Sequence, residues 1–358
     1  MRCSHPSMLA RYTPLAVLTL GFTLNPGMAE ELQWVEGPRD DVALVLPDTL
    51  EESDPRPLIL WLHGFGGSGV EQETYFNLRS QVDERGFMLC LPDGSEDLAG
   101  TRFWNATDAC CDLADLEPDD SDYLRGLIET IIADYPVDLD RIHVTGWSNG
   151  GFMSYRMACD HSDLVSSIAS LAGATFANTG SCTPSEPVHT LQIHGTNDDV
   201  IRFDGQCSFF SCYPGAVDSV EIWAEYNNCT SESQVGEELD LVGNISGAET
   251  SRTLLSTGCE EAGACELWAI NGGNHGPSFN GNFRRELVDW LLTHRKPAPE
   301  DPCPADFTGD ELVNGTDLTE LIANWTGTSS VHDLDGDGTV GGGDLSIFLA
   351  AWGACPEG

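Results

Sequence analysis

The feature that most constrains the fold of this chain is a short apolar run that ends in Gly-x-Ser-x-Gly. Residues 141–147 are β-prone, the motif spans Gly146 to Gly150, and a helix-compatible segment follows at 152–158. A strand, a sharp turn and a helix in this order form a nucleophile elbow, in which the flanking glycines let the backbone turn without a Cβ clash. We therefore expect the hydroxyl of Ser148 above the end of a strand, with the amides of the following helix aimed at the same point.

Apolar runs and helical patterns alternate on both sides of this motif. Further strands are expected at 42–47, 57–62, 87–91, 164–172, 188–194 and 265–270, and helices at 124–135 and 283–292. The run 57–62 is apolar almost throughout, as a strand buried on both faces of a sheet should be. This alternation predicts an α/β fold with a mostly parallel sheet covered by helices on both faces, built from residues 30–296.

A serine nucleophile needs a general base and a carboxylate that orients the base. The loop after 188–194 carries Asp198, and the Gly-rich loop after 265–270 carries His275. Both loops are expected at the same edge of a parallel sheet as Ser148. Taken alone, Asp198 would be better explained as a surface turn residue, and Asp199 and Asp204 are the less favoured candidates for the acid. The order Ser, acid, His makes Ser148, Asp198 and His275 the candidate catalytic triad.

The same chemistry needs two backbone amides that stabilise an oxyanion. The residue after the nucleophile, Asn149, offers one amide. The run His63-Gly64-Phe65-Gly66-Gly67 ends an expected strand, and there Phe65 would offer the other. A Gly-rich turn with no catalytic role is the alternative for this run.

Motifs across residues 40–295 resemble the polyhydroxybutyrate depolymerase and feruloyl esterase family of secreted α/β-hydrolases. The runs that carry the resemblance are Trp104-Asn105-Ala106 with Cys110-Cys111, Tyr123-Leu124-Arg125, Tyr135-Pro136-Val137-Asp138, Val144 to Cys159, His194-Gly195-Thr196-Asn197-Asp198 and Gly272-Gly273-Asn274-His275. The resemblance implies an α/β-hydrolase fold and hydrolysis of carboxylic esters through an acyl-enzyme, without a cofactor for catalysis. It also makes Trp104 and Trp147 candidate substrate contacts.

The resemblance leaves the substrate open between polyhydroxyalkanoates and feruloyl or acetyl esters of polysaccharides. Aromatic residues between Asp204 and Cys259 could wall an acyl pocket, or they could belong to the core; they are Phe209, Phe210, Tyr213, Trp223 and Tyr226. A non-catalytic binding or scaffold protein on the same fold is the alternative function, and a peptidase is a weaker one.

The first residues have the pattern of a secretory signal peptide. Arg2 and Arg11 precede an apolar run at 14–24, and Gly27-Met28-Ala29 ends it with small residues, so cleavage is expected after Ala29. Removing 1–29 takes away two arginines and no acid, which changes the net charge from −42 to −44. Such a chain repels nucleic acid and anionic membranes, and we expect it to be extracellular.

Cysteine usage agrees with export. Cys3 leaves with the signal segment, and the remaining twelve cysteines favour disulfides over metal ligation. Cys207 with Cys212 and Cys259 with Cys265 are close enough to pair, although Cys229 is an alternative partner. The adjacent Cys110 and Cys111 are expected to bond to different partners, since a ring between neighbours is strained.

A proline-rich segment, 297–304, precedes a repeated C-terminal region, 305–358. The repeat has a period of 27 residues, and each unit is an acidic loop followed by an amphipathic helix. The loops place oxygen donors in the spacing of calcium ligands. The expected ligands are Asp306, Thr308, Asp310, Leu312 (carbonyl), Asn314 and Asp317 in the first loop, and Asp333, Asp335, Asp337, Thr339 (carbonyl) and Asp344 in the second.

The duplicated loop and helix resemble type I dockerin modules. Glu311 departs from the glycine usual at the sixth loop position. The resemblance implies structural Ca²⁺ and a cohesin-like protein partner, and the alternative is an acidic, disordered tail. Cys303 and Cys355 bracket the repeat, so a disulfide between them would join its two ends.

Overall fold

The computed structural model describes residues 32–208, 212–230, 232–297, 303–329 and 331–355. The expected signal peptide, 1–29, and most of the proline-rich segment lie outside these ranges. Within them, no helix has the length and apolar character needed to cross a bilayer.

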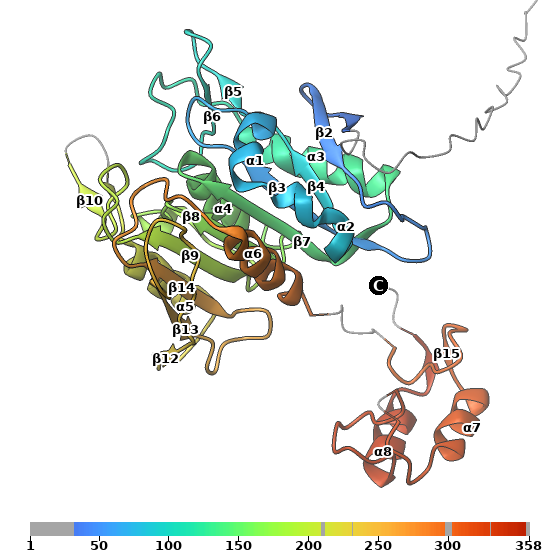
Figure 1. Cartoon of the computed structure of the whole chain (residues 1–358). Helices are drawn as coiled ribbons and strands as arrows, with labels where there is room; N and C mark the ends of the chain where they lie inside the picture. The colour runs from blue at the N-terminus through green and yellow to red at the C-terminus, as the bar shows by residue number, and fades with distance from the viewer. Residues whose placement is uncertain (1–31, 209–211, 231, 298–302, 330, 356–358) are drawn as a thin grey trace, which may run out of the picture.

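A ten-stranded sheet forms the centre of the main domain (Figure 1). Its order is β1-β2-β4-β3-β7-β8-β9-β14-β13-β12. The strands are β1 (Gln33–Glu36), β2 (Asp41–Val45), β3 (Arg56–Leu62), β4 (Met88–Leu91), β7 (Val137–Trp147), β8 (Ser167–Leu171), β9 (His189–Gly195), β12 (Gln234–Val235), β13 (Thr250–Leu255) and β14 (Cys265–Ile270).

The middle of this sheet is parallel, as the sequence predicts. Strands β4, β3, β7, β8, β9 and β14 pair in parallel in that order, and antiparallel strands complete both edges. All side chains of β3 from Pro57 to Leu62 are buried, which explains its continuous apolar run. The expected strand at 164–172 begins later, at Ser167, because a turn at His161 accepts the amides of Leu164 and Val165.

Helices cover both faces of the sheet, and each face has its own apolar cluster. On one face, α1 (Gly69–Phe76), α2 (Val82–Arg85) and α6 (Gly281–Thr293) contribute to a cluster that includes Trp61. On the other face, α3 (Asp120–Asp134), α4 (Asn149–Asp160) and α5 (Ala216–Tyr226) contribute to the cluster around Leu60. Smaller elements are the 3₁₀ turns Leu78–Gln81 and Thr179–Ser181 and the hairpins β5 (Ser95–Glu96) with β6 (Arg102–Phe103) and β10 (Gln206–Cys207) with β11 (Cys212–Tyr213).

The aromatic stretch after Asp204 belongs mainly to the core. Tyr213 and Trp223 are buried in the cluster that α5 shares with the sheet. Phe209 and Phe210 lie outside the described residues. The described part of this stretch therefore favours the core alternative over an acyl pocket.

Five disulfides are present in the described residues: Cys110–Cys111, Cys159–Cys182, Cys207–Cys212, Cys229–Cys259 and Cys303–Cys355. The expectation that Cys110 and Cys111 bond to different partners is wrong. They bond to each other across a cis peptide bond, because the other cysteines pair among themselves or, for Cys90 and Cys265, remain buried thiols.

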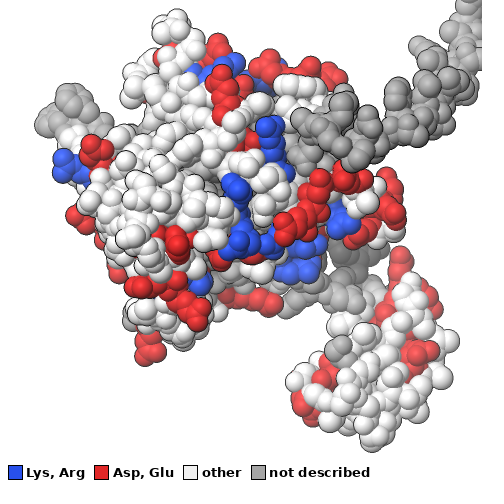
Figure 2. All heavy atoms as spheres, in the orientation of Figure 1, with Lys and Arg blue, Asp and Glu red and all other residues white. Residues whose placement is uncertain are grey.

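The C-terminal repeat folds around a small apolar cluster of its own. Its elements are β15 (Leu312–Val313), α7 (Gly315–Ala323), α8 (Gly342–Ala350) and β16 (Gly353–Ala354), and β15 pairs with β16. Val313, Leu321 and Phe348 are fully buried in the cluster. The Cys303–Cys355 disulfide joins the two ends of the repeat, as expected. The segment contains ten acids and no Lys or Arg, and Figure 2 shows only acidic charges on its visible surface.

Glu311 has a left-handed backbone with φ of 64°, whereas the equivalent residue of the second loop is Gly338 with φ of 87°. A side chain in this region costs about 1 kcal/mol relative to glycine. We therefore expect Glu311→Gly to stabilise the repeat by about that amount. Differential scanning calorimetry of the full chain checks this as a higher midpoint for the repeat's transition. Gly338→Ala is the matched control, and it should lower the same midpoint.

Candidate active site

The elbow after β7 is built on close backbone contacts that only glycine permits. A Cβ on Gly150 would lie 2.1 Å from the carbonyl oxygen of Leu62, and one on Gly146 would lie 2.6 Å from the carbonyl carbon of Gly150. Ser148, between them, has φ of 56° and ψ of −118°, a conformation that non-glycine residues adopt only when the surroundings enforce it. The Ser148 amide donates to the carbonyl of Leu171 at 2.8 Å, which fixes the turn against β8.

The three candidate triad residues meet although they lie far apart in the sequence. His275 Nε2 lies 3.0 Å from Ser148 Oγ, and His275 Nδ1 lies 2.8 Å from Asp198 Oδ2. The second contact gives Nδ1 the proton, because a carboxylate can only accept. Nε2 is then free to accept the Ser148 proton, which is the arrangement a general base needs.

Asp198 is a buried carboxylate supplied with several donors. Its Oδ1 accepts the amides of Val200 and Ile201, each at 2.9 Å, and its Oδ2 accepts from His275. Burial alone would raise the pKa of Asp198, but hydrogen bonds from His194, His275 and the Val200 amide outweigh burial and hold the pKa below its usual range. Asp198 therefore stays ionised while it orients His275.

A second histidine faces Asp198 from the end of β9. His194 Nε2 lies 2.8 Å from the carbonyl oxygen of Ile201 and 3.4 Å from Asp198 Oδ2. Gln192 Nε2 donates to His194 Nδ1 at 3.0 Å and to the carbonyl of Gly173 at 2.9 Å. Tyr155 donates to Gln192 Oε1 at 2.8 Å, which sets the orientation of the amide. Nδ1 of His194 therefore accepts, and its Nε2–H points at Ile201 and Asp198.

Sequence reasoning did not identify this buried chain of Tyr155, Gln192 and His194. The feature of the sequence that could have revealed it is a pair of polar side chains, Gln192 and His194, on the same face of a strand expected to be buried. Polar residues at such positions need partners inside the fold. Here the partners lead to the candidate catalytic acid.

Removing the His194 donor is expected to lower kcat for an aryl ester by about tenfold, the value of one hydrogen bond to a charged group. His194→Leu should show this loss with little change in KM. His194→Gln should recover most of the activity, since its amide nitrogen can replace Nε2. Equal loss in both variants, or a parallel loss in thermal stability, would mean that His194 acts only through packing.

The loop after β3 brings Phe65 beside the elbow. A Cβ on Gly64 would lie 3.0 Å from the Trp147 ring and 3.4 Å from the Ser148 Cβ, so the loop passes directly over the nucleophile. Within the described residues, the backbone amides of Phe65 and Asn149 have no hydrogen-bond partner. Two free amides next to the nucleophile form the arrangement that an oxyanion requires.

The two candidate substrate contacts differ in exposure. Trp104 is fully buried, and its Nε1 donates to the carbonyl of His63 at 3.0 Å. Its backbone N–H and C=O bond the side-chain amide of Asn149. It therefore supports the Phe65 and Asn149 amides from behind and cannot touch a substrate in this structure. Trp147 is partly exposed, and its Nε1 donates to the carbonyl of His275 at 2.8 Å. It holds the loop that carries the base.

Both acidic loops of the C-terminal repeat gather carboxylates. Oxygens of Asp306, Asp310 and Asp317 lie within 4.8 Å of one another, as do those of Asp333, Asp335 and Asp337. The carboxylate of Asp344 instead accepts the amides of Leu334, Asp335 and Gly341 and lies outside the second group. The other expected ligands lie on the same loops: Thr308, Leu312, Asn314 and Thr339.

Comparisons with known proteins agree with this geometry. The model of the Abhydrolase_2 family, described as phospholipase/carboxylesterase, matches residues 49–213. Feruloyl esterase B of Piromyces equi is 26% identical over 245 residues, which cover 65% of this chain and 42% of that protein. Feruloyl esterase B of Neurospora crassa is 27% identical over 259 residues, which cover 67% of this chain and 84% of that protein.

The chain spans less than half the length of two of the curated relatives it matches. Among solved structures, an acetyl xylan esterase from Aspergillus awamori superposes with a TM-score of 0.51 at 15% identity, covering 73% of this chain and 98% of that one. The parallel sheet, the elbow after β7 and the superposition show that the main domain has an α/β-hydrolase fold, and residues 49–213 are similar to the phospholipase/carboxylesterase family.

Proposed function

We propose that this protein is a serine esterase in which Ser148, His275 and Asp198 form the catalytic triad. One observation carries the proposal: the continuous hydrogen bonds from Ser148 Oγ through His275 to Asp198, at 3.0 and 2.8 Å. The free amides of Phe65 and Asn149 beside Ser148 support it. A non-catalytic scaffold protein would have no need for this geometry.

The reaction follows from these contacts. Ser148 Oγ attacks the ester carbonyl while His275 Nε2 takes the hydroxyl proton, and the Phe65 and Asn149 amides donate to the oxyanion. The tetrahedral intermediate collapses, the alcohol leaves with the proton from His275, and an acyl-enzyme remains. Water then attacks the acyl-enzyme, with His275 again taking the proton. The carboxylic acid leaves, and Ser148 recovers its hydrogen.

The substrate we favour is a feruloyl or acetyl ester of a polysaccharide. The matched relatives include feruloyl esterases and a bifunctional acetylxylan esterase/xylanase. Polyhydroxyalkanoate is the alternative. Rates on methyl ferulate, acetylated xylan and polyhydroxybutyrate separate these substrates. Reaction of Ser148 with a fluorophosphonate tests the nucleophile independently, and an unlabelled protein with no activity on the panel would support the scaffold function.

Secretion is part of the proposal. Five disulfides in the described residues are typical of a protein that folds in an oxidising compartment. The signal-like residues 1–29 agree with this location. Mass spectrometry of the protein exported by an expression host should find a chain that begins at Glu30.

We further propose that residues 305–358 form a dockerin-like module with a structural Ca²⁺ in each loop. The donor set fits the ion, since hard oxygens converge in each loop and no Lys or Arg lies in the segment to neutralise them. Asp306, Asp310 and Asp317 would hold one ion, and Asp333, Asp335 and Asp337 the other, with Asp344 as an expected further ligand. Bound Ca²⁺ would supply the charge that lets these carboxylates stay close together.

Such a module would dock to a cohesin-like protein. Four large side chains at equivalent positions of the two repeats, 27 residues apart, are exposed: Ile322 and Leu349, and Trp325 and Trp352. Exposed apolar groups of this size are typical of an interaction surface. Calorimetric titration of the full chain with a cohesin domain tests the proposal, and Trp325→Ala with Trp352→Ala should weaken any binding.

A further inference from the structure

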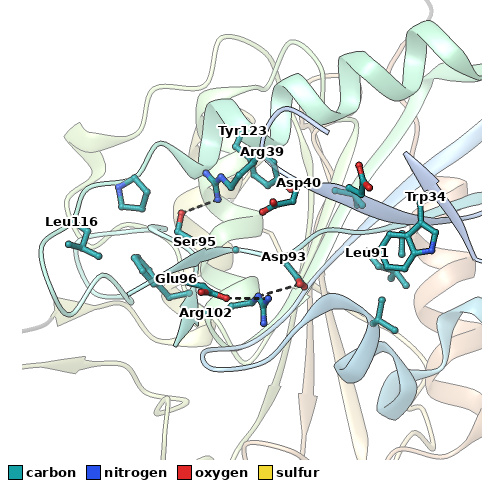
Figure 3. A pocket seen from close by; sticks show the side chains of 17 residues that line it. Trp34, Arg39, Asp40, Leu91, Asp93, Ser95, Glu96, Arg102, Leu116 and Tyr123 are labelled. Atoms are coloured by element: carbon teal, nitrogen blue, oxygen red, sulfur yellow. Dashed lines mark hydrogen bonds and ion pairs between the residues drawn. The ribbon is translucent and has the colours of Figure 1, made fainter. Parts of the chain in front are cut away.

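A cavity of about 750 Å³ lies outside the proposed triad, and Figure 3 shows the side chains that line it. The turn between β1 and β2, the hairpin of β5 and β6, and the N-terminal part of α3 surround it. Ser148, Asp198 and His275 do not line it. Neither the triad nor the oxyanion amides account for its polar side chains.

Tyr123 offers an unused donor in this cavity. Its side chain is 7% exposed, and its hydroxyl has no hydrogen-bond partner within the described residues. The Arg39 guanidinium lies over its ring, 4.0 Å from the centroid. Burial raises the pKa of Tyr123, and the nearby carboxylates of Asp40 and Asp93 raise it further, so the hydroxyl keeps its proton. The hydroxyl oxygen is open to the cavity and not fully buried, so it can donate to a ligand there.

The charges around the cavity disfavour an anionic ligand. Four carboxylates line it, against two guanidinium groups; the carboxylates are Asp40, Asp41, Asp93 and Glu96. Both arginines already have partners. Arg39 bonds Asp120 at 2.8 Å and Ser95 at 2.9 Å, and Arg102 pairs with Asp93 at 3.3 Å and Glu96 at 3.2 Å; Figure 3 shows the bonds to Ser95, Asp93 and Glu96. Asp40 has no side-chain partner among the described residues. The cavity therefore offers neutral donors and free acceptors, which suit hydroxyl groups.

One side of the cavity is aromatic. Trp34 lines it and is 62% exposed, an unusual exposure for so large an apolar side chain. A flat indole face can pack against the C–H face of one sugar ring, while carboxylates and a phenol further along the cavity bond hydroxyls of neighbouring units. An aromatic surface together with a few convergent polar groups is the usual composition of a small-molecule site.

The wall of the cavity is bonded to the loop that carries the proposed oxyanion donor. The Gly94 amide donates to His63 Nε2 at 2.9 Å, and the Gly66 amide donates to the carbonyl of Arg102 at 2.8 Å. His63 Nδ1 therefore carries its proton and donates to the carbonyl of Gly64 at 2.8 Å. Both ends of segment 93–102 are therefore bonded to the loop that carries Phe65.

We propose that this cavity is a subsite for neutral sugar units of the substrate, with Trp34 at one end and Tyr123 and Asp40 nearer the other (Figure 3). A role for this subsite in catalysis rests on the proposed esterase function. In that case the bound sugar belongs to the alcohol portion of the ester. The subsite holds the polysaccharide next to the loop that positions Phe65. Binding of the sugar itself does not depend on a working triad.

Isothermal titration of the full chain carrying Ser148→Ala with a neutral xylo-oligosaccharide tests this binding. We expect a saturable heat, and we expect Tyr123→Phe and Asp40→Asn in the same background each to raise Kd about fivefold to tenfold, the value of one hydrogen bond. Tyr226→Phe, at a partly buried site, and Asp48→Asn, at an exposed site, are matched controls outside the cavity and should leave Kd unchanged. An oligogalacturonate of equal length should not bind, because its carboxylates meet those of the cavity.

Absence of heat, or equal Kd values for the cavity variants and the controls, would overturn the subsite. Stronger binding of the oligogalacturonate, or of spermidine in place of the sugar, would overturn it as well. Asp40 is exposed, so Asp40→Asn keeps the test valid if Tyr123→Phe folds poorly. Hydrolysis of aryl esters by the wild-type chain without sugar binding would remove the subsite alone. Sugar binding without any esterase activity would remove the proposed function alone.

Discussion

Replacing Ser148 with alanine is expected to lower kcat/KM for a short aryl ester by about 10⁴- to 10⁶-fold. The variant lacks the oxygen that forms the acyl-enzyme, so His275 and the amides of Phe65 and Asn149 have no nucleophile to assist. Steady-state rates with 4-nitrophenyl acetate measure the loss. Single-turnover experiments on the wild type should show an acyl-enzyme that the variant does not form.

The alanine variant should fold normally, because the strained turn is held by the backbone contacts of Gly146 and Gly150 and by the Ser148 amide. Thermal unfolding within a few degrees of wild type would show this. Ser233→Ala, at an exposed position before β12, is the matched control and should keep full activity. Retention of wild-type activity by Ser148→Ala would exclude the proposed mechanism.

Removing Ca²⁺ is expected to unfold the C-terminal repeat and leave the hydrolase domain folded. In the described residues, all groups of clustered metal-ligand side chains lie within 303–355. With Ca²⁺ about 1,000-fold above its Kd, binding adds about 4 kcal/mol to stability, and chelation removes it. Without the cation, the clustered carboxylates repel one another across a core as small as Val313, Leu321 and Phe348.

Calorimetry of the full chain with and without EGTA checks this result as the loss of one transition. Activity on 4-nitrophenyl acetate should not change. Asp306→Ala and Asp333→Ala remove the first ligand of each loop, and each should reduce the number of bound ions by one. An unchanged calorimetric trace in EGTA, with no heat on Ca²⁺ titration, would refute the calcium sites. The Cys303–Cys355 disulfide is retained in all of these variants and so does not complicate the comparison.

Patterns along the chain predicted most of the main sheet. Strands β3, β7, β9 and β14 lie where apolar runs indicate them, because a strand buried between two layers of helices needs apolar side chains on both faces. The short edge strands β1 and β12 and helices α1 and α5 were not predicted. Their sequences are mixed in polarity, and pairing or packing against the sheet rather than local pattern determines their structure.

The cysteines show where sequence spacing fails. Cys303 and Cys355 lie at the two ends of a repeat, and they pair because these ends lie side by side in the fold. Cys265 was a candidate partner for Cys259, yet Cys259 pairs with Cys229 and Cys265 remains a buried thiol on β14. Which cysteines pair depends on the distances between their sulfur atoms in the folded protein, and the spacing of cysteines along the chain does not determine those distances.

The sequence by itself determined the identity and order of the candidate triad, since Gly-x-Ser-x-Gly, Asp198 and His275 each follow an expected strand. The motif is readable in the sequence because a Cβ at Gly146 or Gly150 would collide with neighbouring backbone, so this turn requires glycine at both positions. Only the tertiary structure decided that Gln192 orients His194 toward Asp198, that Trp104 is buried against Asn149, and that Tyr123 faces a cavity. These facts depend on side-chain directions and on contacts between segments distant in sequence, which no local pattern specifies.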